Sequence, residues 1–204
     1  MHRISLACLA VVAGLLTGCV GRQKIEGDRQ APDLDRKLST FVYIEEGEIA
    51  SLIVNTQPAR FRDGAPYVPF QIAVANRGLR TMLISRESFE LVDEEGNRYP
   101  AAGPRELLDG YEYLDLDRTP TLANLEGIIV DRFAANTRYE SNFSPTRTAI
   151  SGTVRERVVL PRHGYIVDFI YFPAPRSGVK GHRFDLFLRA PEMRDPVFVK
   201  FEVR

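Results

Sequence analysis

The chain has 204 residues, of which 44% are hydrophobic and 26% are charged, as in an ordinary globular protein. Basic and acidic residues balance at 27 each, so the chain carries no overall field that would attract a nucleic acid or an anionic surface. After residue 18, no segment approaches the roughly 20 apolar residues that a membrane span needs. Composition and charge therefore favour one folded domain and argue against a nucleic acid as partner.

Residues 1–18 have the layout of a secretory signal peptide. His2 and Arg3 give a short positive start, and an apolar run from Ile4 to Leu16 follows. This run is too short for a transmembrane helix but has the length of the apolar core of a signal peptide. We therefore predict that residues 1–18 are removed from the mature protein.

Cys19 closes a short motif directly after this apolar run. Leu16, Thr17 and Gly18 precede it, as one aliphatic residue and two small ones. The motif resembles the lipobox of bacterial lipoproteins, which implies diacylglycerol on the Cys19 thiol, cleavage before Cys19 and acylation of the freed amine. Two or three acyl chains anchor a protein stably, whereas one chain binds a membrane only marginally. The alternative is an ordinary cysteine in an N-terminus that stays uncleaved.

The residue after the motif bears on which membrane the protein occupies. In the enterobacterial sorting scheme that a lipobox implies, Asp at this position retains a lipoprotein in the inner membrane. Val20 stands there instead. The resemblance therefore implies a lipid-anchored protein of the cell envelope, at the outer membrane of a Gram-negative bacterium.

Residues 19–39 comprise the lipidated cysteine and a polar segment. The stretch after Cys19 is charged and shows no usable periodicity, and we expect a flexible tether of about 25 Å root-mean-square length. Residues 40–204 contain no cysteine, so this domain forms no disulfide bond and depends on a hydrophobic core. No cofactor is expected apart from the covalent lipid on Cys19.

From residue 40 onward, hydrophobic residues alternate with polar ones, which predicts strands with one face in the core and one face in water. The expected strands cover residues 41–44, 49–55, 68–76, 81–84, 89–93, 154–160, 165–172, 183–189 and 197–204. Turns are expected at 94–97, where Gly96 supplies a positive φ, and at 160–164, where Pro161 fixes φ and Gly164 relieves it. The pattern predicts an all-β fold, an antiparallel β-sandwich.

The order of these pieces resembles a family of exported bacterial domains that includes the secreted immunoprotective antigens. The matching pieces are an apolar strand ending in Asn (Phe70–Asn76), a Phe-x-Leu-x-Asp strand (Phe89–Asp93), the turn glycine Gly96 and Tyr99. The resemblance implies an immunoglobulin-like sandwich. It implies no particular activity, because the biochemical roles of that family are mostly undefined.

A stretch at about residues 101–150 departs from a plain sandwich. Pro104 at a helix start and Gly110 after its end predict a short helical turn. A second helix should follow the N-cap residue Thr119. Its apolar stripe, at helical spacing, consists of Leu122, Leu125, Ile129 and Phe133. This partly helical insertion either binds a partner or covers an open end or edge of the sandwich.

Residues that could carry out catalysis are sparse. His163 lies in a predicted turn and His182 just before a strand, and neither has the spacing of a metal ligand. The sequence contains no Gly-x-Ser-x-Gly elbow, no phosphate-binding P-loop and no dinucleotide-binding glycine motif. We therefore expect neither a metal site nor an enzyme.

One cluster of aromatic and acidic residues is a candidate binding site. Tyr111, Tyr113, Asp115 and Asp117 would share one face if their segment were extended. Aromatic rings beside carboxylates are typical of surfaces that bind sugars or cations. The competing interpretation, which we favour, is an amphipathic edge strand.

Two further polar features stand out in the predicted strands. Asp168 lies inside an apolar strand, where a buried carboxylate needs a partner that one of the many arginines could supply. Arg155 and Arg157 would share one exposed strand face. They form either a salt-bridged surface or a binding site for lipopolysaccharide phosphates.

Three functions follow from these observations, in order of preference. The first is a non-enzymatic protein-interaction or structural module that docks an envelope protein. The second is a glycan or small-ligand binding lipoprotein that uses Tyr111, Tyr113 and the neighbouring acids. The third is an envelope hydrolase, which the missing histidine and cysteine constellations disfavour.

Overall fold

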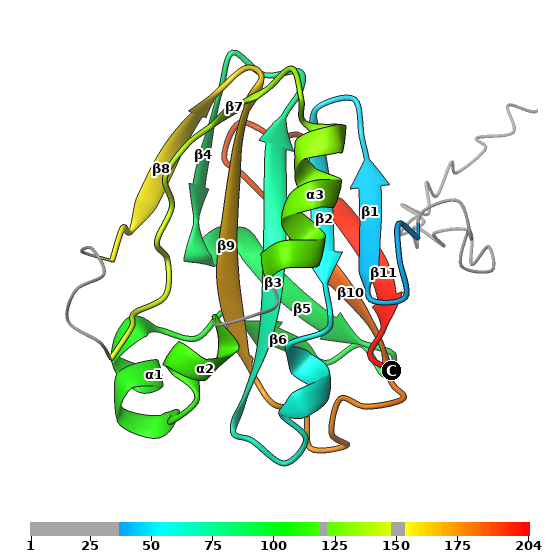
Figure 1. The fold of residues 1–204 in the computed structure, drawn as a ribbon, viewed down its shortest axis with the longest axis vertical. Helices are drawn as coiled ribbons and strands as arrows, with labels where there is room; N and C mark the ends of the chain where they lie inside the picture. The colour runs from blue at the N-terminus through cyan, green and yellow to red at the C-terminus, as the bar shows by residue number, and fades with distance from the viewer. Residues whose placement is uncertain (1–36, 119–121, 148–153) are drawn as a thin grey trace, which may run out of the picture. The chain divides into compact units, whose positions relative to one another are not determined.

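The computed structural model describes residues 37–118, 122–147 and 154–204 (Figure 1). The chain divides into two units, residues 1–31 and 32–204, and the described part belongs to the second. The lipobox with Cys19 and the expected N-cap Thr119 lie outside the described residues. Within the described part, no helix is long and apolar enough to cross a membrane.

The first layer of the domain is a five-stranded sheet. Its strands, in spatial order, are β1 (Val42–Glu46), β2 (Ala50–Asn55), β3 (Tyr67–Asn76), β9 (Gly164–Pro173) and β7 (Thr137–Arg138). Neighbouring strands are antiparallel, except that β7 pairs with β9 in parallel. The central strands of this sheet, β3 and β9, are each ten residues long.

The second layer consists of two smaller antiparallel sheets. The four-stranded sheet has the order β11 (Val197–Glu202), β10 (Arg183–Leu188), β5 (Phe89–Asp93) and β6 (Arg98–Pro100). The two-stranded sheet pairs β4 (Thr81–Ser85) with β8 (Arg157–Pro161). The predicted all-β antiparallel sandwich is confirmed, and the finer likeness to an immunoglobulin-like domain stays a prediction.

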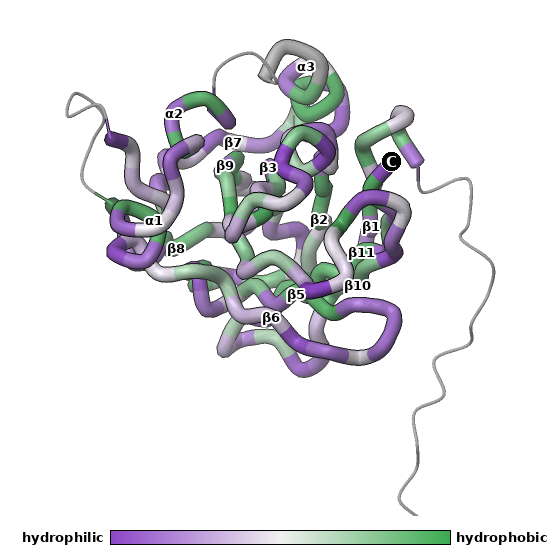
Figure 2. The backbone as a smooth tube through the Cα atoms, turned by 90° about the horizontal axis from the view of Figure 1, so that it is seen from below, coloured by the Kyte–Doolittle hydropathy of each residue, from purple (hydrophilic) through white to green (hydrophobic). Residues whose placement is uncertain are grey.

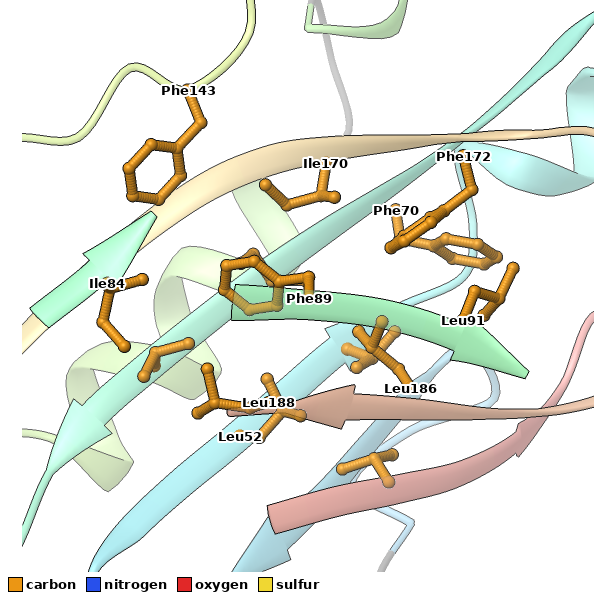
Figure 3. Close-up of a cluster of buried hydrophobic side chains, with 14 of the residues drawn as sticks. Leu52, Phe70, Ile84, Phe89, Leu91, Phe143, Ile170, Phe172, Leu186 and Leu188 are labelled. Atoms are coloured by element: carbon orange, nitrogen blue, oxygen red, sulfur yellow. The ribbon is translucent and has the colours of Figure 1, made fainter. Parts of the chain in front are cut away.

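The main hydrophobic core lies between the two layers (Figure 3). Alternate residues of each strand point into it, as the period-two pattern predicted. Phe70 on β3 shows the packing, because its ring lies 5.1 Å from Phe201 and 6.0 Å from Phe172. Each such fully buried side chain contributes roughly 1.5–3 kcal/mol relative to exposure, which is why the fold needs no disulfide bond.

The insertion is partly helical, as predicted. It contains α1 (Pro104–Gly110), α2 (Leu114–Asp117) and α3 (Leu122–Arg132), while two short 3₁₀ helices, η2 (Ala59–Phe61) and η3 (Arg86–Ser88), lie elsewhere. Pro104 occupies the first turn of α1, and the backbone N–H of Gly103 donates to Glu106 Oε2 at 2.8 Å. Figure 1 shows α3 lying across the five-stranded sheet, with α1 and α2 at one end of it.

Both faces of the inner strands β2, β3 and β9 are buried, which corrects the expectation that one face meets water. Leu125, Ile129 and Phe133 pack on the outward side chains of β1, β2 and β3, among them Ala73 and Ala75. Sequence alternation misassigned this side, because a row of Gln and Ala residues is polar enough to suit solvent and small enough to admit a helix. α3 therefore covers a sheet face, rather than the open end or edge that the sequence suggested.

The two predicted turns differ in which residue relieves the backbone. Gly96 has a φ of +87°, as expected for the β5–β6 turn. In the turn before β9, the positive φ of +63° belongs to His163 and not to Gly164. Gly164 is needed for a different reason, because a Cβ atom there would lie 2.9 Å from the ring of Tyr139.

Candidate functional site

The segment with the four candidate binding residues is a turn followed by a short helix, so the predicted edge strand is wrong. α1 ends at Gly110, and α2 begins at Leu114. Leu107 and Leu114 are fully buried against Phe169 of β9, in a hydrophobic cluster separate from the main core. This burial favours two short helical turns over an extended strand, because a strand would have placed only every second residue inward.

Tyr111 and Asp117 are brought together by these turns, but inside the protein. The Tyr111 hydroxyl donates to Asp117 Oδ2 at 2.7 Å, and Arg62 Nε donates to Asp117 Oδ1 at the same distance. Tyr111 and the Asp117 carboxylate are almost wholly buried. These two residues therefore hold the insertion against the segment before β3, and neither is placed to contact a ligand.

Burial controls the electrostatics of this network. It raises the pKa of the Asp117 carboxyl, while the hydrogen bond from Tyr111 and the charge of Arg62 partly lower it again. Burial likewise raises the pKa of the Tyr111 hydroxyl, which donates to that carboxyl. The tyrosine stays protonated at physiological pH, so the network acts as a fixed structural bond and not as a proton donor.

The other two candidates, Tyr113 and Asp115, lie nearer the surface. The ring of Tyr113 is covered by the Arg62 guanidinium at 4.5 Å, and Asp115 Oδ1 accepts a hydrogen bond from the backbone N–H of Arg147 at 3.0 Å. Arg147 also donates to the carbonyl oxygens of Leu108 and Tyr111. A pocket of about 230 Å³ lies between Tyr113 and Arg147, which is below the usual 300–1,000 Å³ of small-ligand sites.

Arg155 and Arg157 are both exposed, but they do not share a strand as expected. β8 begins only at Arg157, and Arg155 precedes it. Arg155 Nη2 pairs with Glu140 Oε2 at 3.0 Å, as one of the two sequence interpretations proposed. Arg157 lies opposite Ser85 on the ribbon that β4 and β8 form. Their binding of phosphates stays a prediction.

Asp168 is buried, and its hydrogen-bond partners are backbone amides. Its Oδ2 accepts from the N–H of Phe143 at 2.9 Å, and its Oδ1 accepts from the N–H of Phe169 at 2.8 Å. Burial raises the pKa of this carboxyl, and the two amides partly oppose the rise, with a smaller contribution from the charge of Arg118. The carboxyl thus fixes the segment after β7 along the edge of β9 and directs the Phe143 ring into the main core (Figure 3).

A different surface carries aromatic side chains that are not covered by the rest of the domain. On the outer side of the four-stranded sheet, Phe187 of β10 and Phe198 of β11 stand opposite each other and stack at 5.1 Å and 26°. Phe198 is 37% exposed. We call this surface the open face, and its outward side chains are Glu90, Val92, Arg98, Pro100, Arg183, Asp185, Phe187, Phe198, Lys200 and Glu202.

Charged side chains surround the stacked pair on the open face. Asp185 stands opposite Lys200, Arg183 stands opposite Glu202, and Arg98 forms an ion pair with Glu90. The Lys200 ammonium lies 5.6 Å from the Phe198 ring. Partial burial raises the pKa of the Asp185 carboxyl, and Lys200 partly opposes it. The face thus combines an apolar centre with a charged rim.

Sequence reasoning missed several of these residues. Arg62 and Arg147 are far from the 111–117 segment in the sequence, and nothing in their local pattern marks them as its partners. Phe187 did leave a signal, because it occupies an outward position of an alternating strand where a polar residue is expected. Across the described ranges, no three His, Cys, Asp or Glu side chains gather closely enough to hold a metal ion.

Comparisons with known proteins give one structural similarity. No family model matches the chain, and no curated protein sequence matches it. The fold is similar to a candidate lipoprotein (ycdA) from Bacillus subtilis, with a TM-score of 0.41 and 11% sequence identity. The similarity covers 78% of this chain and 38% of that chain, so this chain spans well under half the length of that protein.

Proposed function

We propose that this chain is a lipid-anchored protein of the cell envelope that binds another protein through its open face and performs no catalysis. The observation that carries the proposal is the difference between the two outer faces of the sandwich. The outer face of the five-stranded sheet is covered by the helices, whereas the open face exposes a stacked aromatic pair. Exposed apolar patches with polar rims are typical of protein interaction sites.

The chemistry of the open face favours a protein over a glycan or a small ligand. Protein interfaces are enriched in aromatic residues at their centre and in charged residues at their rim. Phe187 and Phe198 form such a centre, and charged side chains of β5, β6, β10 and β11 form the rim. The alternative site around Tyr113 has less support, because Tyr111 and Asp117 are buried and bonded to each other.

The anchor in this proposal rests on the sequence. The order of a positive start, an apolar run and Leu16-Thr17-Gly18-Cys19 supports acylation at Cys19, and Val20 supports the outer membrane. Fractionation of cells that express the native chain and Cys19→Ala tests this part separately. We expect the native chain in the membrane fraction and the variant in the soluble fraction. Equal membrane retention of both chains would contradict the anchor.

Site-specific photo-crosslinking in intact cells tests the docking surface. A photoreactive residue at position 198 should give one discrete adduct, whereas the same residue at position 159 should give none. Val159 is the matched control because it is 58% exposed on β8, outside the open face. A discrete adduct from both positions, or from neither, would contradict the proposal.

A second variant makes this test specific to the stacked pair. Phe187→Ser removes the ring that supports position 198 without emptying the main core, because Phe187 lies on the outer side of β10. Loss of a central aromatic residue of an interface typically costs about 2 kcal/mol or more, which is over tenfold in affinity. We therefore expect the adduct from position 198 to fall at least about tenfold, while the protein stays folded and loses only about 1–2 kcal/mol in the free energy of unfolding. An unchanged adduct would place the docking surface elsewhere.

A further inference from the structure

Exposed apolar side chains also gather at the end of the domain where η2 and α2 meet. Phe61 is 62% exposed at the end of η2, and Leu116 is 61% exposed on α2. The Arg62–Asp117 ion pair joins these two segments, since Phe61 directly precedes Arg62 and Leu116 directly precedes Asp117. We call Phe41, Phe61, Tyr113 and Leu116 the end patch. Figure 2, seen from below, shows α1 and α2 near each other at this end of the domain.

Arginine stacked on aromatic rings gives the end patch an amphipathic character. The Arg60 guanidinium lies 4.8 Å from the ring of Phe41 and 5.2 Å from the ring of Phe61. The Arg62 guanidinium lies 4.5 Å from the ring of Tyr113. Arginine and aromatic side chains can bury their apolar parts while their polar ends stay hydrated, which suits the boundary between lipid and water.

The end patch is also where the polypeptide enters the domain. Phe41 immediately precedes β1, and its carbonyl oxygen accepts a hydrogen bond from the N–H of Thr56 at 2.8 Å, close to η2. Lys37 pairs with Tyr43 at the start of the same strand. Only 18 residue steps (37 − 19) separate Lys37 from Cys19, a fully extended length of at most about 60 Å. An acylated Cys19 would therefore keep this entry point within that distance of the lipid, and at about 25 Å if the connection has coil statistics.

This short connection strengthens the contact that the few apolar side chains of the end patch can make with a membrane. On their own they would bind a membrane only weakly, since a contact of this size offers little area. An anchored domain meets the lipid surface at an effective concentration of about millimolar order, because the contact is then intramolecular. Weak apolar contacts are sufficient under that condition to orient the domain.

We propose that the end patch rests on the surface of the membrane that holds the anchor, so that the domain stands on this end. The proposal rests on the proposed function, because it requires acylation at Cys19. The occupant is the boundary between headgroups and acyl chains of a phospholipid bilayer. Orientation through the end patch would hold the open face clear of the lipid, where a protein partner can reach it.

Tryptophan fluorescence tests this proposal cleanly, because the chain contains no tryptophan. The native chain, purified from membranes with its anchor, is prepared with Phe61→Trp or with Val159→Trp and reconstituted into phosphatidylethanolamine–phosphatidylglycerol vesicles. Both positions are similarly exposed, so either substitution leaves the core intact. We expect the emission of Phe61→Trp to shift to the blue and to be quenched by lipids with brominated chains. Val159→Trp should show neither effect.

Vesicle flotation separates the failure of the anchor from the failure of the orientation. If the chain floats with the vesicles but Phe61→Trp behaves like Val159→Trp, the orientation is overturned and the anchor stands. If the chain does not float, both proposals are overturned. A concentration-dependent blue shift of Phe61→Trp in the unlipidated Cys19→Ala chain without vesicles would instead assign the end patch to contact with a second copy, and would also overturn the membrane contact.

Discussion

The two sheets of this sandwich have opposite outer surfaces, although their strands alternate in the same way. On the five-stranded sheet, outward residues are mostly alanine, branched aliphatic or aromatic and pack under α1, α2 and α3. On the four-stranded sheet, six of the ten outward residues are charged, and Phe187 and Phe198 form a stacked aromatic pair among them. The insertion buries the first surface, whereas the second surface is open to a binding partner. Of the two roles that the sequence left open for the insertion, binding a partner or covering the sandwich, the structure therefore favours covering.

The largest expected effect separates the covered surface from the open one by a matched pair of substitutions. Phe133→Ala removes a buried ring whose centroid lies 5.3 Å from that of Tyr165, and we expect a loss of about 3–5 kcal/mol in the free energy of unfolding. Phe198→Ala removes a partly exposed ring and should cost about 1–2 kcal/mol. Urea denaturation followed by circular dichroism measures both. Equal losses would show that the open face is structural.

The second prediction concerns the Arg62–Asp117 ion pair, which holds α2 against the segment before β3. Arg62→Ala removes the guanidinium that pairs with the buried Asp117 carboxylate, and such a loss typically costs about 3–5 kcal/mol. The control is Arg155→Ala, which breaks an exposed pair with Glu140 and should cost less than about 1 kcal/mol. Similar small effects for both variants would mean that Asp117 is neutral in the folded protein.

A further variant tests the other bond to Asp117, which is the hydrogen bond from the Tyr111 hydroxyl. Tyr111→Phe keeps the aromatic ring and removes only the hydroxyl that donates to Asp117. It should cost about 1–3 kcal/mol, because a buried acceptor loses its donor. An unchanged free energy of unfolding in this variant would indicate that the Tyr111 hydrogen bond does not stabilise the packing of α1 and α2.

The third prediction is a pH dependence at the edge of the covered sheet. Burial raises the folded-state pKa of Asp168 above its unfolded value, so the folded state binds more protons between those two values. The stabilisation is thus present below about pH 4 and is lost as the pH rises through the folded pKa. Asp168→Asn cannot ionise, so it should gain stability relative to the native chain from pH 4 upward, by about 1.4 kcal/mol for each pH unit between the two pKa values.

Asparagine also weakens one of the two amide contacts, so the absolute stability of Asp168→Asn is not the diagnostic quantity. The diagnostic quantity is the difference in the free energy of unfolding between the two chains, measured by urea denaturation at several pH values. A difference that stays constant from pH 4 to 8 would contradict a raised pKa for Asp168.

How far the sequence predicts this molecule depends on whether a feature is local. The strands and α1 follow from short patterns, so Phe89–Asp93, the Gly96 turn and Pro104 were placed correctly. The 111–117 segment was misassigned because its alternation fits a strand equally well, and only burial of Leu107 and Leu114 against β9 decides for a helix. Partners distant in sequence leave no local mark, so Arg62 could not be assigned to Asp117 in advance.

The same limit explains the candidate sites. The open face needed only alternation plus an outward apolar residue, and Phe187 carried that signal in the sequence. Asp168 was correctly marked as a buried carboxylate, yet its partners are backbone amides, which every residue has and no sequence pattern reveals. Exposure of Phe61 and Leu116 likewise depends on the tertiary arrangement around η2 and α2.

The smallest expected effect comes from a substitution that stabilises α3, the helix over the five-stranded sheet, and leaves the open face unchanged. Gly127 lies within α3 on its exposed side, and a Cβ atom there would meet nothing within 4 Å. Gly127→Ala should therefore stabilise the protein by about 0.5–1 kcal/mol, because alanine loses less backbone freedom in a helix than glycine does. The matched control is Gly96→Ala, which should be destabilising because its φ of +87° disfavours a side chain. If α3 serves only the fold, Gly127→Ala raises the unfolding midpoint and leaves the adduct from position 198 unchanged. A change in that adduct would instead show that α3 takes part in binding, and the division between the two outer surfaces would have to be redrawn.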